Sequence, residues 1–283
     1  MKSYIFSLPV IKEVMFTDHN GNYKKKIEKR QRDLIVKIPF IKPFLKPDEN
    51  ILLITTGYSR VDTLDQILTS WLFIYLKRSL FVFTNKRIFH IPTTVRYGYR
   101  NSISQILYSD TQSIELKGST LVVQCLACGG QEKFIGIRGK EKKKIREILG
   151  TIEFEESYNL RAERAHLCPQ CTRELTKGSY ACPNCKLSFK RKSRLRSLIP
   201  GLGYFYVRQI FLGIVNIIAE LVLIGFLISF YLKLSENMQT AILFLILFGG
   251  LYIFQKIAVM VHSNHFIDEH IPEIEVVRPL SSL

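Results

Sequence analysis

Two long apolar runs dominate the hydrophobic pattern of the C-terminal third of the chain. Residues 210–232 contain a single charged side chain, Glu220, and residues 239–262 contain a single one, Lys256. A helix of about 20 apolar residues spans the hydrocarbon core of a membrane. Only residues 233–238 separate the runs, so we predict two transmembrane helices in a tight antiparallel hairpin. Both runs exceed ordinary core-helix lengths, which argues against a buried helix pair in a soluble protein.

The pattern upstream, over residues 46–152, is that of strands followed by one helix. Short runs rich in β-branched and aromatic residues predict strands at 50–56, 71–76, 79–84, 86–91, 121–124 and 133–137. Residues 84–85 predict a tight turn, a further strand follows residues 100–106, and Gly129-Gly130 joins the last two runs as a hairpin. A closing helix is predicted because apolar residues recur at helical spacing, at Ile145, Ile148, Leu149 and Ile152.

The cysteines change this picture because all six lie in Cys-x-x-Cys pairs. Four of them share the spacing C-x2-C-x10-C-x2-C: Cys168, Cys171, Cys182 and Cys185. Two such turns that face each other surround one ion with four thiolates, in the tetrahedral geometry that zinc takes. Four thiolates leave no open coordination position, which favours a structural Zn²⁺ over a catalytic one. An iron site of the rubredoxin type is the less favoured alternative.

This motif resembles short zinc ribbons of the membrane-tethered kind, over residues 166–190. Such turns often carry glycine after the second cysteine, where this chain has Thr172 and Lys186. Residues 173–175 and 179–181 are expected to form two short strands around Lys177-Gly178. A segment this short has no core of its own, so metal binding would supply most of its folding free energy.

Charge is distributed unevenly along the chain. Residues 1–196 contain 36 of the 40 Lys and Arg residues and 18 of the 24 acidic residues, a net charge of +18. Such a basic half suits an anionic membrane surface or nucleic acid. Six basic residues directly precede the first apolar run: Lys186, Lys190, Arg191, Lys192, Arg194 and Arg196. By the positive-inside rule, the N-terminal part and the C-terminal tail are expected in the cytoplasm.

The charged residues within the apolar runs predict an intramembrane polar group. Glu220 is expected roughly 15 Å and Lys256 roughly 9 Å below the cytoplasmic end. A long lysine side chain can cover this difference, so the two can form an interhelical ion pair, with Asn216 one turn from Glu220 adding a hydrogen bond. The alternative is that Lys256 extends to the interface while Glu220 is protonated or faces a partner. Both interpretations stay open at the level of sequence.

The stretches LFVFTNKRIFHI and YRNSISQILYSD, together with the closing helix, resemble bacterial pleckstrin-homology-like domains. This resemblance implies a bent antiparallel β barrel with a C-terminal helix. Domains of this type bind lipids, peptides or one another, so the fold alone does not determine function.

The segment Pro200-Gly201-Leu202-Gly203-Tyr204-Phe205-Tyr206 resembles the start of a widespread family of small two-helix membrane domains. The family pattern has Gln where this chain has Tyr204, and its later glycine is replaced near Arg208. The resemblance covers about residues 197–262 and implies a compact helical hairpin. The three consecutive aromatic residues are expected in the interfacial aromatic belt.

These elements give a fold of several domains in a membrane protein. The predicted order is a basic extension, a pleckstrin-homology-like domain, a linker, a zinc ribbon, a transmembrane hairpin and a cytoplasmic tail, at 1–45, 46–152, 153–166, 167–190, 191–262 and 263–283. In the extension, Lys24–Arg32 is a charge run that we interpret as a solvated hairpin arm, with a lipid-facing or nucleic-acid-facing role as the less favoured alternative. Asn20-Gly21-Asn22 predicts a turn.

Two further groups carry less specific signals. Cys125 and Cys128 would lie on opposite faces of a regular strand, so we expect unligated thiols, with redox chemistry or a metal shared with another chain as alternatives. His262, His265 and His270 lie near Asp268 and Glu269, for which we favour a disordered cytoplasmic end over a metal site.

The sequence shows no nucleophile–base constellation and no phosphate-binding glycine loop, so we expect a protein that is not an enzyme. The leading interpretation is a scaffold or sensor anchored in the bacterial inner membrane, multi-pass, with both termini cytoplasmic. Its pleckstrin-homology-like domain would bind a protein partner, another copy of the chain or lipid headgroups, and the zinc ribbon would join it to the membrane. Two alternatives are a membrane-tethered nucleic-acid-binding protein, disfavoured because the ribbon has few aromatic residues for stacking, and an accessory subunit of a transport complex.

Overall fold

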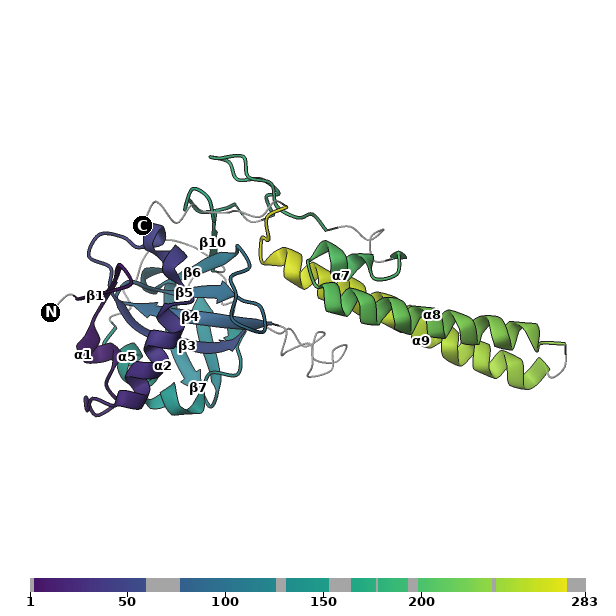
Figure 1. The fold of residues 1–283 in the computed structure, drawn as a ribbon, viewed down its shortest axis with the longest axis horizontal. Coiled ribbons are helices and arrows are strands. Elements are labelled where there is room, and N and C mark those ends of the chain that lie inside the picture. The colour runs from purple at the N-terminus through teal and green to yellow at the C-terminus, as the bar shows by residue number, and fades with distance from the viewer. Residues whose placement is uncertain are drawn as a thin grey trace. The chain divides into compact units, whose positions relative to one another are not determined.

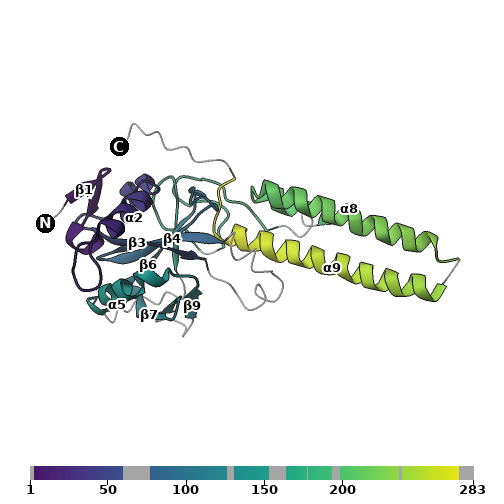
Figure 2. The same cartoon turned by 60° about the horizontal axis from the view of Figure 1, so that its bottom comes forward.

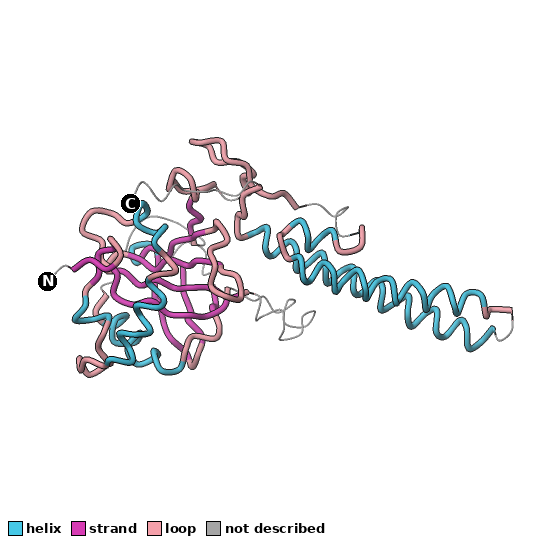
Figure 3. Tube along the Cα trace, viewed as in Figure 1, coloured by secondary structure: helices cyan, strands magenta, loops and turns pink. Residues whose placement is uncertain are grey.

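The computed structural model describes residues 3–59, 77–125, 131–152, 164–176, 178–192, 198–235 and 238–273. The chain divides into two compact units, Met1–Ser188 with Pro272–Leu283 and Phe189–Ile271. Figure 3 shows that the strands belong to the first unit and that the described part of the second unit contains helices and loops. Each unit has its own packing, described separately below.

The first unit contains two sheets, in which neighbouring strands are antiparallel except for the parallel pair β2 and β3. A seven-stranded sheet has the order β1-β2-β3-β4-β5-β6-β10, and a three-stranded sheet has the order β7-β8-β9 (Figure 1). The strands of the large sheet are β1 (Ser3–Ile5), β2 (Leu8–Val10), β3 (Ile51–Tyr58), β4 (Arg78–Thr84), β5 (Arg87–Pro92), β6 (Ile103–Leu107) and β10 (Ala165–Leu167). Those of the small sheet are β7 (Thr111–Lys117), β8 (Thr120–Cys125) and β9 (Gln131–Phe134).

The structure confirms the strands predicted near residues 50–56, 79–84 and 86–91, and the pairing of β8 with β9. Residues 103–107 are themselves a strand, and β7 follows them. The strand predicted at 71–76 and the turn at Gly129-Gly130 lie outside the described residues. The strands form two separate sheets rather than one closed barrel, which corrects the barrel expectation in that respect.

Helical segments cover the large sheet on one side, and the small sheet and its helix cover the other (Figure 2). The helical segments of this unit, counting both sides of the large sheet, are α1 (Lys12–Met15), α2 (Lys25–Ile35), η1 (Pro39–Phe44), η2 (Tyr108–Asp110), η3 (Gly139–Glu141) and α5 (Lys142–Gly150). Alternating residues of β4 serve the two cores: Leu80 and Val82 join α2 and η1 in one, whereas Phe81 and Phe83 join α5 in the other. Because successive side chains of a strand point to opposite faces, a sheet buried on both sides is apolar at every position.

The closing helix α5 agrees with the predicted apolar stripe. Ile145, Ile148 and Leu149 are buried in the core shared with the small sheet, and Ile152 packs against that core. A helix of this length is marginal in water by itself. Burial of each large apolar side chain contributes about 1.5–3 kcal/mol of stability, and this contribution holds α5 in place.

The charge run Lys24–Arg32 is not a hairpin arm, because it lies mostly in helix α2. The basic residues cover the outer face of the helix, while Leu34 and Ile35 enter the core. The Gln31 side chain donates to the Ile54 carbonyl and accepts from the Ile54 N–H, both at 2.9 Å. This amide satisfies backbone groups of β3 beyond the end of its short pairing with β2. Asn20-Gly21-Asn22 does form a turn, closed by the bridge between Thr17 and Tyr23.

One buried ion pair joins the loop before β3 to strand β5. Arg87 Nη2 and Nε lie 2.6 and 2.9 Å from the two carboxylate oxygens of Glu49, which is fully buried. Burial acts to raise the pKa of the Glu49 carboxyl, but hydrogen bonds from Arg87, the Lys46 N–H and Thr84 outweigh it and hold this pKa below its usual value. The pair therefore stabilises the fold above the ordinary carboxyl pKa, and this contribution is lost as pH falls through the lowered value.

We predict that Arg87→Met destabilises the protein by about 3–5 kcal/mol, because it leaves the Glu49 carboxylate buried without its partner. The matched control is Arg32→Met, which breaks an exposed pair with Glu28 of similar length, 2.7 Å, and is expected to cost less than about 1 kcal/mol. Denaturant unfolding of the two full-length variants at neutral pH measures both values. Equal losses would contradict the assignment of the buried pair as a stabilising anchor.

Candidate metal centre and membrane hairpin

Strand β10 leads directly into the cysteine-rich segment. Its residues pair antiparallel with β6, Leu167 opposite Ile103, and the Leu167 side chain is buried in the core on the α2 side of the sheet. The Gln105 side chain of β6 donates to Glu174 at 2.5 Å. The first cysteine turn is therefore fixed to the edge of the large sheet by a strand, an apolar side chain and a polar contact.

The two cysteine turns have the same backbone structure. In the first, the Cys168 N–H donates to the Arg173 carbonyl at 2.8 Å, and the Thr172 N–H donates to the Cys168 carbonyl at 2.9 Å. Cys182 and Lys186 make the corresponding bonds in the second turn, at 2.9 and 3.0 Å. Thr172 and Lys186 have φ values of 63° and 61°, in the left-handed region that favours glycine. Each turn thus requires a left-handed residue after its second cysteine, which explains why zinc ribbons often carry glycine at this position.

The expected strands at 173–175 and 179–181 do not pair with each other within the described residues. Glu174 instead pairs back to Leu167, and Ala181 pairs forward to Ser188. Each turn is consequently a small hairpin of its own. The two expected strands do not pair with each other because the hydrogen bonds that close a Cys-x-x-Cys turn are local.

The four sulfur atoms form one cluster. Cys168 Sγ lies 3.5 Å from Cys185 Sγ, Cys171 Sγ lies 3.5 Å from Cys182 Sγ, and all four lie within 4.8 Å of one another. A disulfide requires about 2.05 Å, so these cysteines are free thiols. Sulfurs at about 2.3 Å from a tetrahedral zinc ion are about 3.8 Å apart. The donor set therefore fits a four-coordinate metal ion.

Backbone N–H groups point at the sulfurs and favour their thiolate forms. Burial raises the pKa of the Cys168 thiol, although the N–H groups of Gln170 and Cys171 act against it. Burial acts in the same direction at Cys171, but there the Arg173 N–H and neighbouring side chains outweigh it and lower the pKa to about 7. A metal ion binds cysteine as the thiolate, so a bound cation would offset the cost of burying the charged form at Cys168.

The second unit consists of α7 (Leu202–Tyr206), α8 (Ile210–Leu232) and α9 (Met238–Asp268). The helices α8 and α9 are long and apolar enough to cross a membrane, and they pack against each other as the predicted hairpin. Near its tip, Phe226 stacks on Phe248 at 4.9 Å and Phe230 on Phe244 at 4.5 Å between ring centroids. Residues 263–268 continue α9, where we expected the tail to begin.

Three glycines let α7 lie against the two long helices. A Cβ atom on Gly201 would lie 2.7 Å from the Gly213 carbonyl oxygen, one on Gly203 would lie 2.9 Å from Val259, and one on Gly213 would lie 2.6 Å from the Phe205 ring. Gly201 also has a φ of 69°. These contacts give the Pro-Gly-Leu-Gly segment a physical reason, namely close backbone approach.

The structure brings together the three predicted intramembrane residues. Lys256 Nζ lies 2.7 Å from Glu220 Oε2, and Asn216 Nδ2 donates to Glu220 Oε1 at 2.6 Å. The sequence did not single out Gln255, whose amide donates to Asn216 at 2.9 Å. Lys256 also donates to the Leu198 carbonyl at 2.8 Å. Glu220 is fully buried between the helices, so its charge is neutralised by this network.

The basic residues before the first helix differ in their surroundings. Lys186 is exposed, whereas Lys190 is buried, bonds to the Tyr206 carbonyl and lies 5.0 Å from the Tyr206 ring centroid. Lys190 is therefore not the surface residue that we expected. Arg191 is exposed, with its N–H bonded to the Tyr206 hydroxyl, and Lys192 pairs with Asp268 at 2.6 Å. Arg194 and Arg196 lie outside the described residues.

The aromatic and histidine residues near the helix ends also have defined places. Tyr204 is buried, and its hydroxyl lies 2.8 Å from His262 Nδ1. His262 and His265 belong to α9 rather than to a disordered end. The Cys125 and Cys128 side chains lie outside the described residues.

One buried polar cluster was not predicted. His90 of β5 lies between the Ser59 hydroxyl, 2.9 Å from Nε2, and the Ser104 hydroxyl, 3.0 Å from Nδ1. Arg164 Nη1 lies 2.7 Å from the same Nδ1. Because a guanidinium only donates, Nδ1 accepts and the ring carries its proton on Nε2. The alternation of side chains along β5 places His90 on an inward face of the strand. This alternation is the sequence signal from which a buried histidine could have been predicted.

We predict that Gly201→Ala lowers the unfolding temperature of the protein in detergent by several degrees, because Cβ meets a backbone oxygen and the residue has a positive φ. The control is Gly225→Ala in α8, where a Cβ meets nothing within 4 Å and alanine is the better helix former. Thermal unfolding of both variants in the same micelles compares them. A loss at Gly225 as large as that at Gly201 would contradict the close approach of α7.

A second prediction concerns the polar network of the hairpin. Lys256→Met leaves the Glu220 carboxylate buried without its cation and should destabilise the hairpin strongly, whereas Glu220→Leu combined with Lys256→Met should recover most of the loss. Lys233→Met, at the end of α8, is the control and should have little effect. Unfolding in detergent, followed by circular dichroism, tests the series. A double variant no better than Lys256→Met would refute the pairing.

Comparison with models of known protein families finds no match to this chain. Comparison with curated proteins likewise finds none. The site assignments therefore depend on the geometry described above.

Proposed function

We propose that the protein is a non-enzymatic scaffold or sensor of the bacterial inner membrane, in which four cysteines hold a structural Zn²⁺ and the sheet domain is the binding module. The observation that carries this proposal is the four-sulfur cluster, which starts at the end of a core strand and precedes two helices of membrane-spanning length. A metal centre in this position stiffens the segment between a folded domain and a membrane anchor.

Zinc is the proposed metal because of the donor set and spacing. Four sulfur ligands with a tetrahedral arrangement select zinc or iron among common metal ions, and a closed shell of four thiolates serves structure. Cys168 and Cys182 are buried, and no described residue of the short hairpins from 168 to 188 belongs to either hydrophobic core of the first unit. The metal would supply cross-links that the segment otherwise lacks.

The sheet domain is proposed to be of the pleckstrin-homology-like type. The meander β3–β6, the meander β7–β9 and the closing helix α5 are the elements that this type requires, in the expected order. The helices α1 and α2 and the hairpin β1–β2 would be additions that cover the outer face of the first meander. Lipid headgroups, a protein partner or a second copy of the chain are the proposed ligands of this domain.

Membrane insertion is supported by the surface of the hairpin. Large apolar side chains cover the outside of α8 and α9, among them Ile246, which is 70% exposed. Water would disfavour such a surface, and hydrocarbon would not. The basic residues before α8 favour an orientation with both termini in the cytoplasm.

We predict that the full-length protein, isolated from bacterial membranes, resists alkaline extraction and contains one zinc ion per chain by mass spectrometry of metals. Cys168→Ser should stay in the membrane fraction, lose the zinc and fall in cellular abundance, because the joint unfolds. Cys125→Ser, outside the four-cysteine motif, is the matched control and should keep both zinc and abundance.

Two outcomes would count against the proposal. Protein released by alkaline extraction would refute the membrane anchor. Loss of zinc in Cys168→Ser with unchanged abundance and unchanged unfolding temperature would refute the structural role of the metal.

A further inference from the structure

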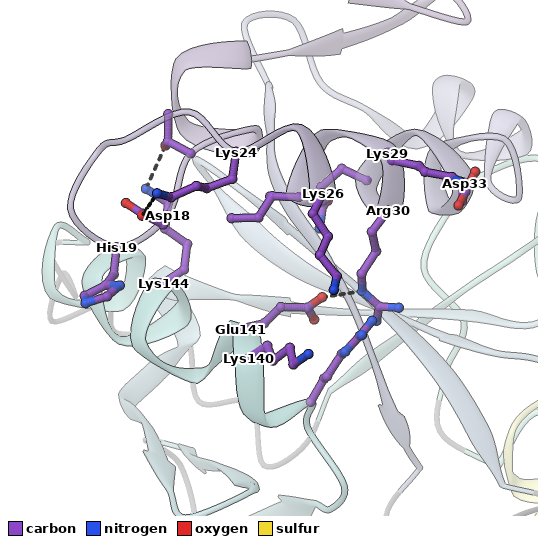
Figure 4. A pocket seen from close by; sticks show the side chains of 14 residues that line it. Asp18, His19, Lys24, Lys26, Lys29, Arg30, Asp33, Lys140, Glu141 and Lys144 are labelled. Carbon is purple, nitrogen blue, oxygen red and sulfur yellow. Dashed lines mark hydrogen bonds and ion pairs between the residues drawn. The ribbon is translucent and has the colours of Figure 1, made fainter.

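A cavity of about 540 Å³ lies in the first unit, lined by the loop after α1, by helix α2, and by η3 with the start of α5 (Figure 4). Seven of its 14 lining residues are Lys or Arg, and three are acidic. Its volume is within the range of small-molecule sites. The excess of cations comes from two segments far apart in sequence, residues 24–30 and 138–144, which the fold brings to one place.

Two of the cations are held in fixed positions. Arg30 Nε lies 2.5 Å from Glu141 Oε1, and Arg30 Nη2 lies 3.2 Å from the Thr56 hydroxyl. Lys144 is buried and lies 3.3 Å from the Thr17 hydroxyl and 3.1 Å from Glu147. Such anchored side chains present positive charge without the full entropy loss of ordering a free lysine upon binding.

Two of the three acidic residues of the cavity, Glu141 and Asp18, already have protein partners, whereas Asp33 makes no hydrogen bond or ion pair within the described part of the chain. The buried Glu141 accepts from Arg30 with one oxygen and from the Thr55 hydroxyl with the other. Asp18 accepts the N–H groups of Asn20 and Asn22, both at 3.0 Å. The negative charges of Glu141 and Asp18 are thus used within the fold, and Asp33 alone is left against the remaining cations.

Four further cations of the cavity form no ion pair. Among the residues that the structure describes, no acidic side chain lies within ion-pair distance of Lys26, Lys29, Arg138 or Lys140. Figure 4 shows Lys26 and Arg30 reaching from α2 toward Glu141, with Lys140 beside Glu141 on the facing segment. Like charges that converge around a cavity repel one another, so an anion between them would relieve the repulsion.

A solvated helix face explains the basic residues of α2 that point outward. It does not explain a hollow into which cations from a second element also project. Guanidinium and ammonium groups arranged around a hollow suit the oxygens of phosphate groups, which accept several charge-assisted hydrogen bonds at once.

We propose that this cavity is a binding site for an anion with two or more phosphate groups, or with a phosphomonoester, contacted by Lys26, Arg138 and Lys140 and positioned by the fixed Arg30. The anion can be a soluble phosphorylated compound or a lipid headgroup. This inference deepens the proposed function, since it gives the binding module a site and a ligand class, but it can fail while the membrane anchor and the zinc site stand.

The experiment uses the full-length protein in uncharged detergent. Inositol hexakisphosphate is the soluble probe and dioctanoyl phosphatidic acid is the lipid probe, each titrated by calorimetry at 150 mM salt. The test variant is Lys26→Gln with Lys140→Gln. The control, Lys37→Gln with Lys143→Gln, makes the same change of charge at residues that do not line the cavity.

We expect the test variant to weaken binding of at least one probe by roughly tenfold or more, as loss of a charge-assisted contact requires, and the control to weaken it less than about threefold. The test variant without probe should unfold at the same or a higher temperature, because charge repulsion in the cavity falls. Arg138→Gln gives a second reading of the same site should the double variant be poorly folded.

Several results would overturn the proposal: no binding of either probe to the wild-type protein, equal losses in the test and control variants, or unchanged affinity in the test variant. Tighter binding of a duplex DNA that depends on the same residues would also overturn it, in favour of a nucleic-acid surface. A preference between the two probes identifies the source of the phosphate. Protein that is extraction-resistant and zinc-loaded yet binds neither probe would refute this inference alone.

Discussion

The pairing of β10 with β6 is the constraint on which the metal centre depends. Three residues at the edge of the large sheet fix the direction in which the chain leaves the core, and Cys168 follows at once. Because Leu167 is buried in the core, the strand cannot move without exposing it. The first cysteine turn is therefore a direct continuation of the sheet and is not separated from it by a linker. Only the second turn has to be captured, and one metal ion can do this by joining four sulfurs that already lie within 4.8 Å.

In both units, buried polar contacts fix the relative positions of elements that apolar packing alone would allow to shift. In the first unit, the Gln31 amide attaches α2 to β3, and Arg87 with Glu49 attaches the loop before β3 to β5. In the second unit, Glu220 and Lys256 set the register of α8 against α9. Apolar side chains can slide past one another at small cost, whereas a buried charge must keep its partner. Each such contact therefore selects one arrangement from several that would bury similar area.

Local signals in the sequence predicted the elements whose causes are local. The 79–91 hairpin follows from period-two patterning and a polar turn, α5 from its apolar stripe, and the cysteine turns from spacing. The hairpin β1–β2 was missed because Phe6 and Ser7 occupy its turn with positive φ, where Asn or Gly is the usual signal. Helix α2 was misread because seven charged residues obscure a stripe of only three buried ones, Gln31, Leu34 and Ile35. Its stability comes from the sheet beneath it, which no window of sequence contains.

The basic cavity shows the same limit for function. Lys24–Arg32 in sequence reads as a charge run, and so does Lys140–Lys144, and each by itself is best explained as a solvated face. Their meaning changes when the chain folds, because the packing of α2 and α5 on opposite sides of β3 brings Arg30 to Glu141 across 111 positions of sequence. A pattern within one element can report which side faces water. It cannot report that two such sides meet, and a site built from both is visible only in three dimensions.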